Sequence, residues 1–85
     1  MKGEFAVYPS LTNGGITIDL NAARSGAVAV NIYNQAGALV MKQQISVVEG
    51  MNIKTMDLSR LQNGVYILQL SQDNIKAVKK LIVQH

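Results

Sequence analysis

Leu61-Gln-Asn-Gly64-Val-Tyr66-Ile-Leu-Gln-Leu70 is the segment that says most about this chain. Gly64 stands where we expect a sharp turn, and Tyr66 follows two residues later at the start of an alternating strand. Alternation places Tyr66, Leu68 and Leu70 on one face, which we expect to be buried. This layout is typical of a tyrosine corner, in which the ring is buried and the hydroxyl bonds to upstream backbone. The segment therefore predicts an all-β fold.

The length and composition predict one small globular domain. A chain of 85 residues buries about 60 to 65% of its unfolded surface on folding. Its apolar content of 48%, with few aromatic residues, predicts a core packed by aliphatic side chains. The absence of cysteine excludes disulfides and thiolate metal or redox sites. We expect residues 1–4 to be linker or added residues and residues 5–85 to form a single domain, taken from the end of a longer protein.

The charge pattern argues against a nucleic-acid partner. The net charge of +3 is mild, and its only cluster is Lys76, Lys79 and Lys80 in the last strand. Binding to a phosphate backbone usually needs a denser stripe of cations and exposed aromatic residues. No apolar stretch approaches the ~20 residues that span a bilayer, and no secretory signal follows Met1. We therefore expect neither a nucleic-acid partner nor a transmembrane segment.

Turn residues divide the rest of the chain into short strands. Pro9 ends the first strand, Gly14 lies in the next turn, and Gly37 supplies a hairpin turn. The strands that we expect cover residues 5–8, 16–20, 27–33, 39–45, 47–58, 65–71 and 75–83. This order predicts an immunoglobulin-like β-sandwich of about seven antiparallel strands, with a small closed barrel as the alternative.

The strand over residues 47–58 is hard to phase. Met51 and Ile53 share one face, whereas Met56 and Leu58 share the other. Either a bulge intervenes or one pair is exposed. We favour Met56 and Leu58 inside, because they lead into the tyrosine corner.

No group of side chains predicts catalysis. The carboxylates lie in different turns or exposed positions, without the spacing of a general acid and base: Glu4, Asp19, Glu49, Asp57 and Asp73. We expect Asp57 and Ser59 to cap a single helical turn over residues 60–62. His85 is the sole imidazole and ends the chain, so we assign it no role. We expect no catalytic, cofactor-binding or metal-binding residue, and no enzyme activity.

The terminal strand is the best candidate for binding. Ala77, Lys79, Leu81 and Val83 alternate with Val78, Lys80 and Ile82. Only one face can enter the core, so the other is either a lysine-rimmed contact patch or an edge protected against aggregation. An exposed edge would also allow a homodimer. Tyr8 and Tyr33 either stack a sugar on one sheet face or serve packing.

The chain resembles a known family in an ordered series of motifs. These are Tyr8-Pro9 with Thr12-Asn-Gly14, Val30-Asn-Ile-Tyr33 with Gly37, Leu58-Ser-Arg-Leu61 with Gly64-Val-Tyr66-Ile-Leu68, and Lys80-Leu-Ile-Val83. Together they resemble the C-terminal sorting domain, type A, of the Por or type IX secretion system. The likeness covers residues 5 to 84. One departure is Pro9-Ser10-Leu11, where the family usually has Pro-Asn-Pro.

The resemblance implies a secretion signal at the end of a cargo protein. Such a cargo reaches the periplasm by its own N-terminal signal, and translocon and shuttle proteins then export it across the outer membrane. A sortase-like cysteine protease removes the domain and attaches the cargo at the cell surface, so catalysis belongs to that partner. The family's signal-bearing motifs fall within a set that we take as candidate recognition residues: Gly64, Tyr66, Lys79, Lys80, Leu81, Ile82 and Val83. The alternative is an immunoglobulin-like accessory module that binds carbohydrate or protein for a larger secreted enzyme.

Overall fold

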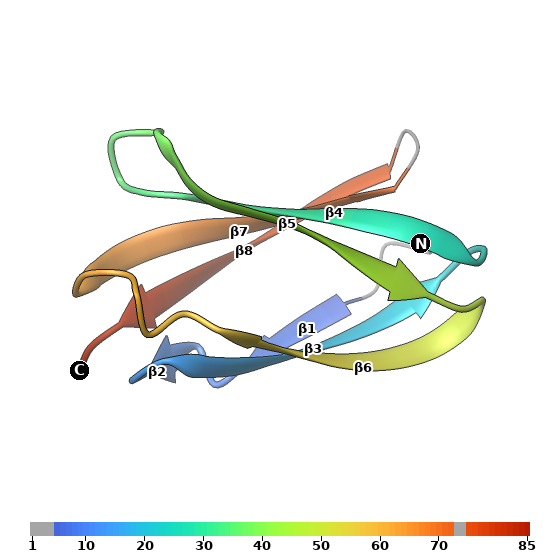
Figure 1. Cartoon of the computed structure of the whole chain (residues 1–85), viewed down its shortest axis with the longest axis horizontal. Coiled ribbons are helices and arrows are strands. Elements are labelled where there is room, and N and C mark those ends of the chain that lie inside the picture. Colours follow the sequence, from blue (N-terminus) through green and yellow to red (C-terminus); the bar gives the residue numbers. More distant parts are fainter. Residues whose placement is uncertain (1–4, 73–74) are drawn as a thin grey trace.

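The computed structural model describes residues 5–72 and 75–85, and this part of the chain is all-β (Figure 1). The strands are β1 (Phe5–Tyr8), β2 (Leu11–Thr12), β3 (Gly15–Ala22), β4 (Gly26–Tyr33), β5 (Leu39–Val47), β6 (Gly50–Asp57), β7 (Gly64–Gln72) and β8 (Ile75–Val83). The predicted all-β class is confirmed. The structure has eight strands where about seven were expected, because β2 forms a short strand of its own.

The strands form two sheets that face each other as a sandwich (Figure 1). The smaller sheet has the order β1-β3-β6, and the larger has the order β2-β8-β7-β4-β5. The strand pairs are antiparallel except β2 with β8, which run parallel. Figure 1 places the C-terminus and the β4–β5 turn at the same end of the sandwich.

The N-terminal segment contributes to both sheets. β1 pairs with β3 in the smaller sheet, the chain then bends at Pro9, and β2 pairs with β8 in the larger one. The backbone N–H of Ile82 donates to Ser10 O at 2.7 Å, and that of Gln84 donates to Thr12 O at 2.8 Å. The last part of β8 therefore has strand partners on both sides, so this part of the terminal strand is not a free sheet edge.

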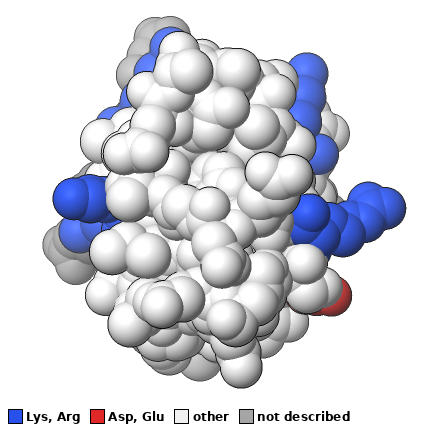
Figure 2. Space-filling view, turned by 90° about the vertical axis from the view of Figure 1, so that its left-hand side faces the viewer, with Lys and Arg blue, Asp and Glu red and all other residues white. Residues whose placement is uncertain are grey.

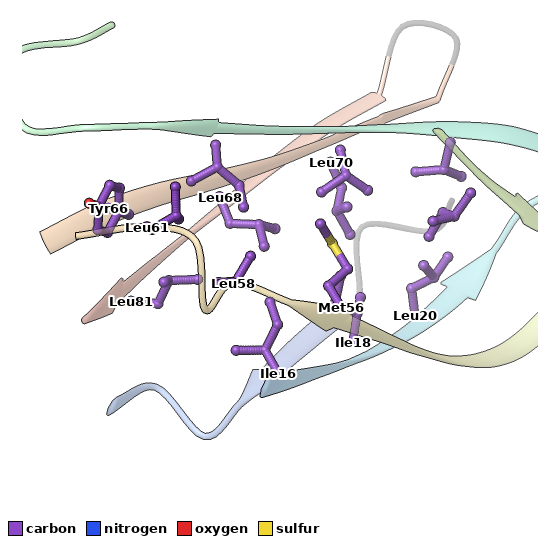
Figure 3. Close-up of a cluster of buried hydrophobic side chains, with 14 of the residues drawn as sticks. Ile16, Ile18, Leu20, Met56, Leu58, Leu61, Tyr66, Leu68, Leu70 and Leu81 are labelled. Atoms are coloured by element: carbon purple, nitrogen blue, oxygen red, sulfur yellow. The ribbon is translucent and has the colours of Figure 1, made fainter. Parts of the chain in front are cut away.

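Alternation along each strand supplies the core. In β3, alternate positions separate into buried apolar and more exposed polar residues, as a half-buried sheet requires. In β7, buried positions also alternate with more exposed ones, but the outward positions include the apolar Val65 and Ile67. Figure 3 shows the buried side chains of both sheets meeting between the layers: Ile16, Ile18, Leu20, Met56, Leu58, Leu61, Tyr66, Leu68, Leu70 and Leu81. Burial of this apolar surface is the main term that stabilises a domain without disulfides.

The phase of β6 agrees with our prediction. Met56 and Leu58 are buried, whereas the side chains of Met51 and Ile53 are 67% and 68% exposed. The register between β3 and β6 continues from Gly15 to Ala22 without a bulge. One pair is therefore exposed, as expected if no bulge intervenes.

Two local predictions need correction. Residues 58–61 form a turn, in which Leu61 N donates to Leu58 O at 3.0 Å, and the described residues contain no helix at this point. The predicted helical turn is therefore wrong, because a single turn gains too few hydrogen bonds to persist without packing. β5 extends to Val47, beyond the predicted end at Ile45, and both residues are buried.

Asn52 organises the turn between β5 and β6. Its Oδ1 accepts from Val48 N at 3.0 Å, and its Nδ2 donates to Val48 O at 2.8 Å and to Gly50 O at 2.9 Å. The residue is buried, and Gly50 has a φ of 97°, which favours glycine. The turn therefore depends on a buried amide.

We expect Asn52→Ala to lower the free energy of unfolding by about 1–3 kcal/mol, because the backbone groups of Val48 and Gly50 lose the hydrogen bonds of the buried amide. Chemical denaturation measures this change. Met51→Ala is the matched control, since its side chain is exposed, and it should change stability by no more than about 0.5 kcal/mol. Equal losses in both variants would show that the amide has no special role.

Candidate functional site

The tyrosine corner has the predicted geometry. The side chain of Tyr66 is 7% exposed, and its hydroxyl donates to Gln62 O at 2.6 Å. This bond ties the start of β7 to the preceding loop, so the closing hairpin begins from a fixed point. The buried ring and its bond to upstream backbone confirm the prediction.

Gly64 begins β7 directly after a bend in the chain at Asn63. Gly64 is not among the glycines with positive φ. A Cβ at this position would lie 3.8 Å from Cε2 of Tyr66, which is an ordinary van der Waals contact. Glycine is therefore not required here by the backbone conformation, although it lies against the ring of the tyrosine corner.

The terminal strand alternates as predicted. Leu81 and Val83 are buried in the core, whereas Lys80 and Ile82 point outward from the larger sheet. Lys79 lies on the inward-facing side, and its Nζ is 5.7 Å from the centre of the Phe5 ring. This cation–π contact connects β8 of the larger sheet to β1 of the smaller one.

His85 holds the end of the chain against two loops. Its backbone N–H donates to Asn63 Oδ1 at 2.9 Å. Its Nε2 lies 2.7 Å from Leu61 O, and its Nδ1 lies 3.0 Å from Asn13 O. Sequence reasoning missed this role, because the ring contacts are backbone oxygens 24 and 72 residues away and carry no local pattern.

The turn after β2 docks on the loop before the tyrosine corner. Thr12 Oγ1 accepts from Gly14 N at 3.0 Å and donates to Gly15 O at 2.6 Å. Gly14 O accepts from Leu58 N at 2.7 Å. A Cβ on Gly14 would lie 3.3 Å from Cβ of Ser59, which is tighter than most real contacts. Close approach of these two turns therefore supports the structural role predicted for Gly14.

The remaining candidate site residues are carboxylates, the imidazole and two tyrosines. No group of three or more His, Cys, Asp or Glu lies together among residues 5–72 and 75–85.

The Tyr8 hydroxyl donates to Asp19 Oδ2 at 3.0 Å, and this bond raises the pKa of Tyr8. Tyr8 lies in the smaller sheet and Tyr33 in the larger one, so the alternative in which the two stack a sugar on one sheet face is wrong. Among residues 5–72 and 75–85, no helix is long and apolar enough to cross a membrane.

Asp57 is a turn-capping residue whose charge is stabilised. Its Oδ1 accepts from Ser59 N at 2.9 Å. This bond, together with the Ser59 side chain and the charge of Arg60, lowers the pKa of Asp57 from its ordinary value of 3.8. Because the pKa is lower in the folded state, the stabilisation is present above pH 3.8 and is lost as the pH falls through the folded value.

We expect Asp57→Asn to remove this pH dependence while keeping a hydrogen-bond acceptor. The wild type should exceed the variant in unfolding midpoint at about pH 6, and the difference should shrink at about pH 3. Denaturant titrations at the two pH values measure it. A difference that stays constant between the two conditions would contradict the assignment.

Fold and site together define a class of protein. The domain is a β-sandwich in which β4 and β2 flank the strands of the closing hairpin, and the C-terminal residues bond to neighbouring loops. The family model described as secretion system C-terminal sorting domain matches residues 6–84. Because the match spans nearly the whole chain, the chain belongs to this family. A search of curated proteins found no match.

The family establishes the general function. The domain is a C-terminal sorting signal of type IX secretion, and its cargo is exported to the cell surface or beyond it. Such a signal interacts with the secretion machinery. The family is one of sorting signals and not a known family of enzymes.

Proposed function

We propose that the secretion machinery recognises the folded shape of the β7–β8 hairpin. The observation that supports this best is the way in which the end of β8 is held. β7 and β2 flank it, and His85 contacts two further loops. A preformed surface loses little conformational entropy on binding, which favours recognition by shape.

The residues that carry recognition in this proposal lie in the tyrosine corner and in β8. Tyr66 anchors the corner, and Leu81 and Val83 keep the strand seated in the core. The outward side chains of Lys80 and Ile82 are then presented to the partner. The full set is that of the sequence prediction: Gly64, Tyr66, Lys79, Lys80, Leu81, Ile82 and Val83. Residues 5–85 act as a single unit in this proposal, with residues 1–4 as a linker.

The cargo route follows the family's general scheme. In this proposal the cargo passes through the periplasm, and translocon and shuttle proteins carry it across the outer membrane. A sortase-like cysteine protease then removes the domain and attaches the cargo at the surface. A homodimer through an exposed sheet edge stays a prediction, for which the exposed Met51 and Ile53 on β6 offer apolar area.

A reporter protein tests the export step. Residues 1–85 are fused to the C-terminus of a periplasmic reporter in a bacterium with a type IX system, and the reporter alone serves as the control. We expect the fusion at the surface or in the medium, and the control in the periplasm. An intact-mass measurement of the exported fusion should show loss of the domain. A fusion that stays in the periplasm would contradict export, and an exported fusion that keeps the domain would contradict cleavage.

A further inference from the structure

The outward face of the larger sheet carries a continuous apolar row that ends in a lysine. The strand registers place Lys80 of β8 opposite Ile67 of β7, Ile67 opposite Tyr33 of β4, and Tyr33 opposite Leu39 of β5. In the adjoining register position, Ile82 lies opposite Val65. Opposed side chains on one sheet face are close enough to form a continuous surface. This face therefore offers exposed apolar area beside a cation.

A hollow of about 460 Å³ lies on this row, beside the β4–β5 turn. Its lining is Tyr33, Asn34, Gln35, Gly37, Val65, Ile67 and Lys80. The Tyr33 hydroxyl donates to Gln69 Oε1 at 3.4 Å. Asn34 Oδ1 accepts from Ala36 N and Ala38 N, each at 3.0 Å, so the turn that forms one wall is held by its own side chain.

A second hollow of about 250 Å³ shares part of this wall and continues toward the tyrosine corner. It shares Asn34, Gln35 and Val65 with the first and reaches Gly64 and Tyr66. The end of the molecule seen in Figure 2 has an uncharged centre, with cations at both flanks and one acidic residue at the lower right. The two hollows thus form one path from the lysine to the corner.

The charges around this path are of one sign. Lys80 lines the first hollow, and Lys42 and Lys76 point outward from the same sheet. The described residues of β2, β4, β5, β7 and β8 include no carboxylate. The path therefore favours an occupant that combines an apolar group with a negative charge.

We propose that this path binds a short extended peptide segment of a partner protein, in which an apolar side chain neighbours a carboxylate. The apolar side chain packs on Tyr33, Val65 and Ile67, and the carboxylate pairs with Lys80. The Gln35 amide supplies a donor and an acceptor for the peptide backbone, and the Nδ2 of Asn34 supplies a donor. A lipid surface fits less well, because recognition of anionic headgroups uses about 4–8 clustered cations and this path has one. The inference rests on the proposed function and names the chemistry of the partner.

Nuclear magnetic resonance titration of the 85-residue chain tests the inference. The probes are acetylated Glu-Leu-Glu amide, the Lys-Leu-Lys counterpart and phosphatidylglycerol vesicles. We expect the acidic peptide to shift amide resonances of the residues that line the two hollows, and the basic peptide to shift none. Shifts caused by the vesicles but not by the acidic peptide, or a flat titration with the acidic peptide, would overturn the proposal.

Two lysine variants locate the binding site. Lys80→Gln should weaken binding of the acidic peptide about two- to fivefold, as expected for a partly exposed ion pair. Lys76→Gln is the matched control, because it removes an outward lysine of the same strand that lies outside the hollow. Equal effects of the two variants would contradict the site. Reporter export separates the two claims, since failure of the wild-type fusion contradicts the proposed function, whereas export with a flat peptide titration contradicts this inference alone.

Discussion

A reporter fused to the domain without residues 80–85 is expected to stay in the periplasm. The deletion removes the buried side chains of Leu81 and Val83, and with them the last strand contacts of β8 with β7 and β2. It also removes the outward surface of Lys80 and Ile82. Fractionation, together with protease treatment of intact cells, measures the surface fraction. Normal surface delivery would rule out the terminal strand as the signal.

A second variant separates the loss of a recognition surface from the loss of the fold. Lys80→Gln combined with Ile82→Thr changes only the outward face and keeps Leu81 and Val83 in the core. We expect this variant to fold and to be exported less than the wild type. If the double variant were fully exported while the deletion reporter stayed in the periplasm, the core side of β8 would matter for export and its outward face would not.

Tyr66→Ala should have the largest effect of any single side-chain truncation in the corner. Removing a buried aromatic ring costs about 3–5 kcal/mol, and a domain of this size has a total stability of about 4–12 kcal/mol. The variant should therefore lose much of its stability in equilibrium denaturation. Tyr66→Phe keeps the ring and loses the bond to Gln62 O, so we expect a loss of about 1 kcal/mol.

Tyr33→Phe is the matched control for the hydroxyl. The Tyr33 hydroxyl bonds to Gln69 Oε1 at 3.4 Å on the outward face, whereas that of Tyr66 bonds at 2.6 Å beside a buried ring. The longer bond should contribute less to stability. If the two phenylalanine variants were equally stable, the corner hydroxyl would have no special role.

Local patterns were enough to predict the parts of the fold that depend on alternation. A period of two placed Tyr66, Leu68 and Leu70 on one face, and the structure buries all three. The same rule, with the apolar pair nearest the corner placed inside, gave the correct phase for Met56 and Leu58. These predictions succeeded because the face of a strand depends on sequence neighbours alone.

Features that depend on distant partners could not be predicted in this way. The parallel pairing of β2 with β8 joins the two ends of the chain, and the contacts of His85 are with backbone oxygens. The hollow beside Lys80 arises where the β4–β5 turn meets β7. Each of these features needs the tertiary arrangement, and Gly64 shows in addition that a familiar turn residue need not adopt a special backbone conformation.

The central claim is that the signal is the folded hairpin and not the terminal sequence by itself. The most direct test is the surface fraction of a reporter whose domain carries Leu68→Asp. This change places a charge at a fully buried position and leaves residues 80–85 intact. Ser71→Asp, farther along β7 on its outward face, is the matched control. We predict that the Leu68→Asp reporter stays in the periplasm while the control is exported. Circular dichroism should show that the Leu68→Asp domain is unfolded. If this unfolded domain delivered the reporter to the surface as well as the control does, the claim would be contradicted.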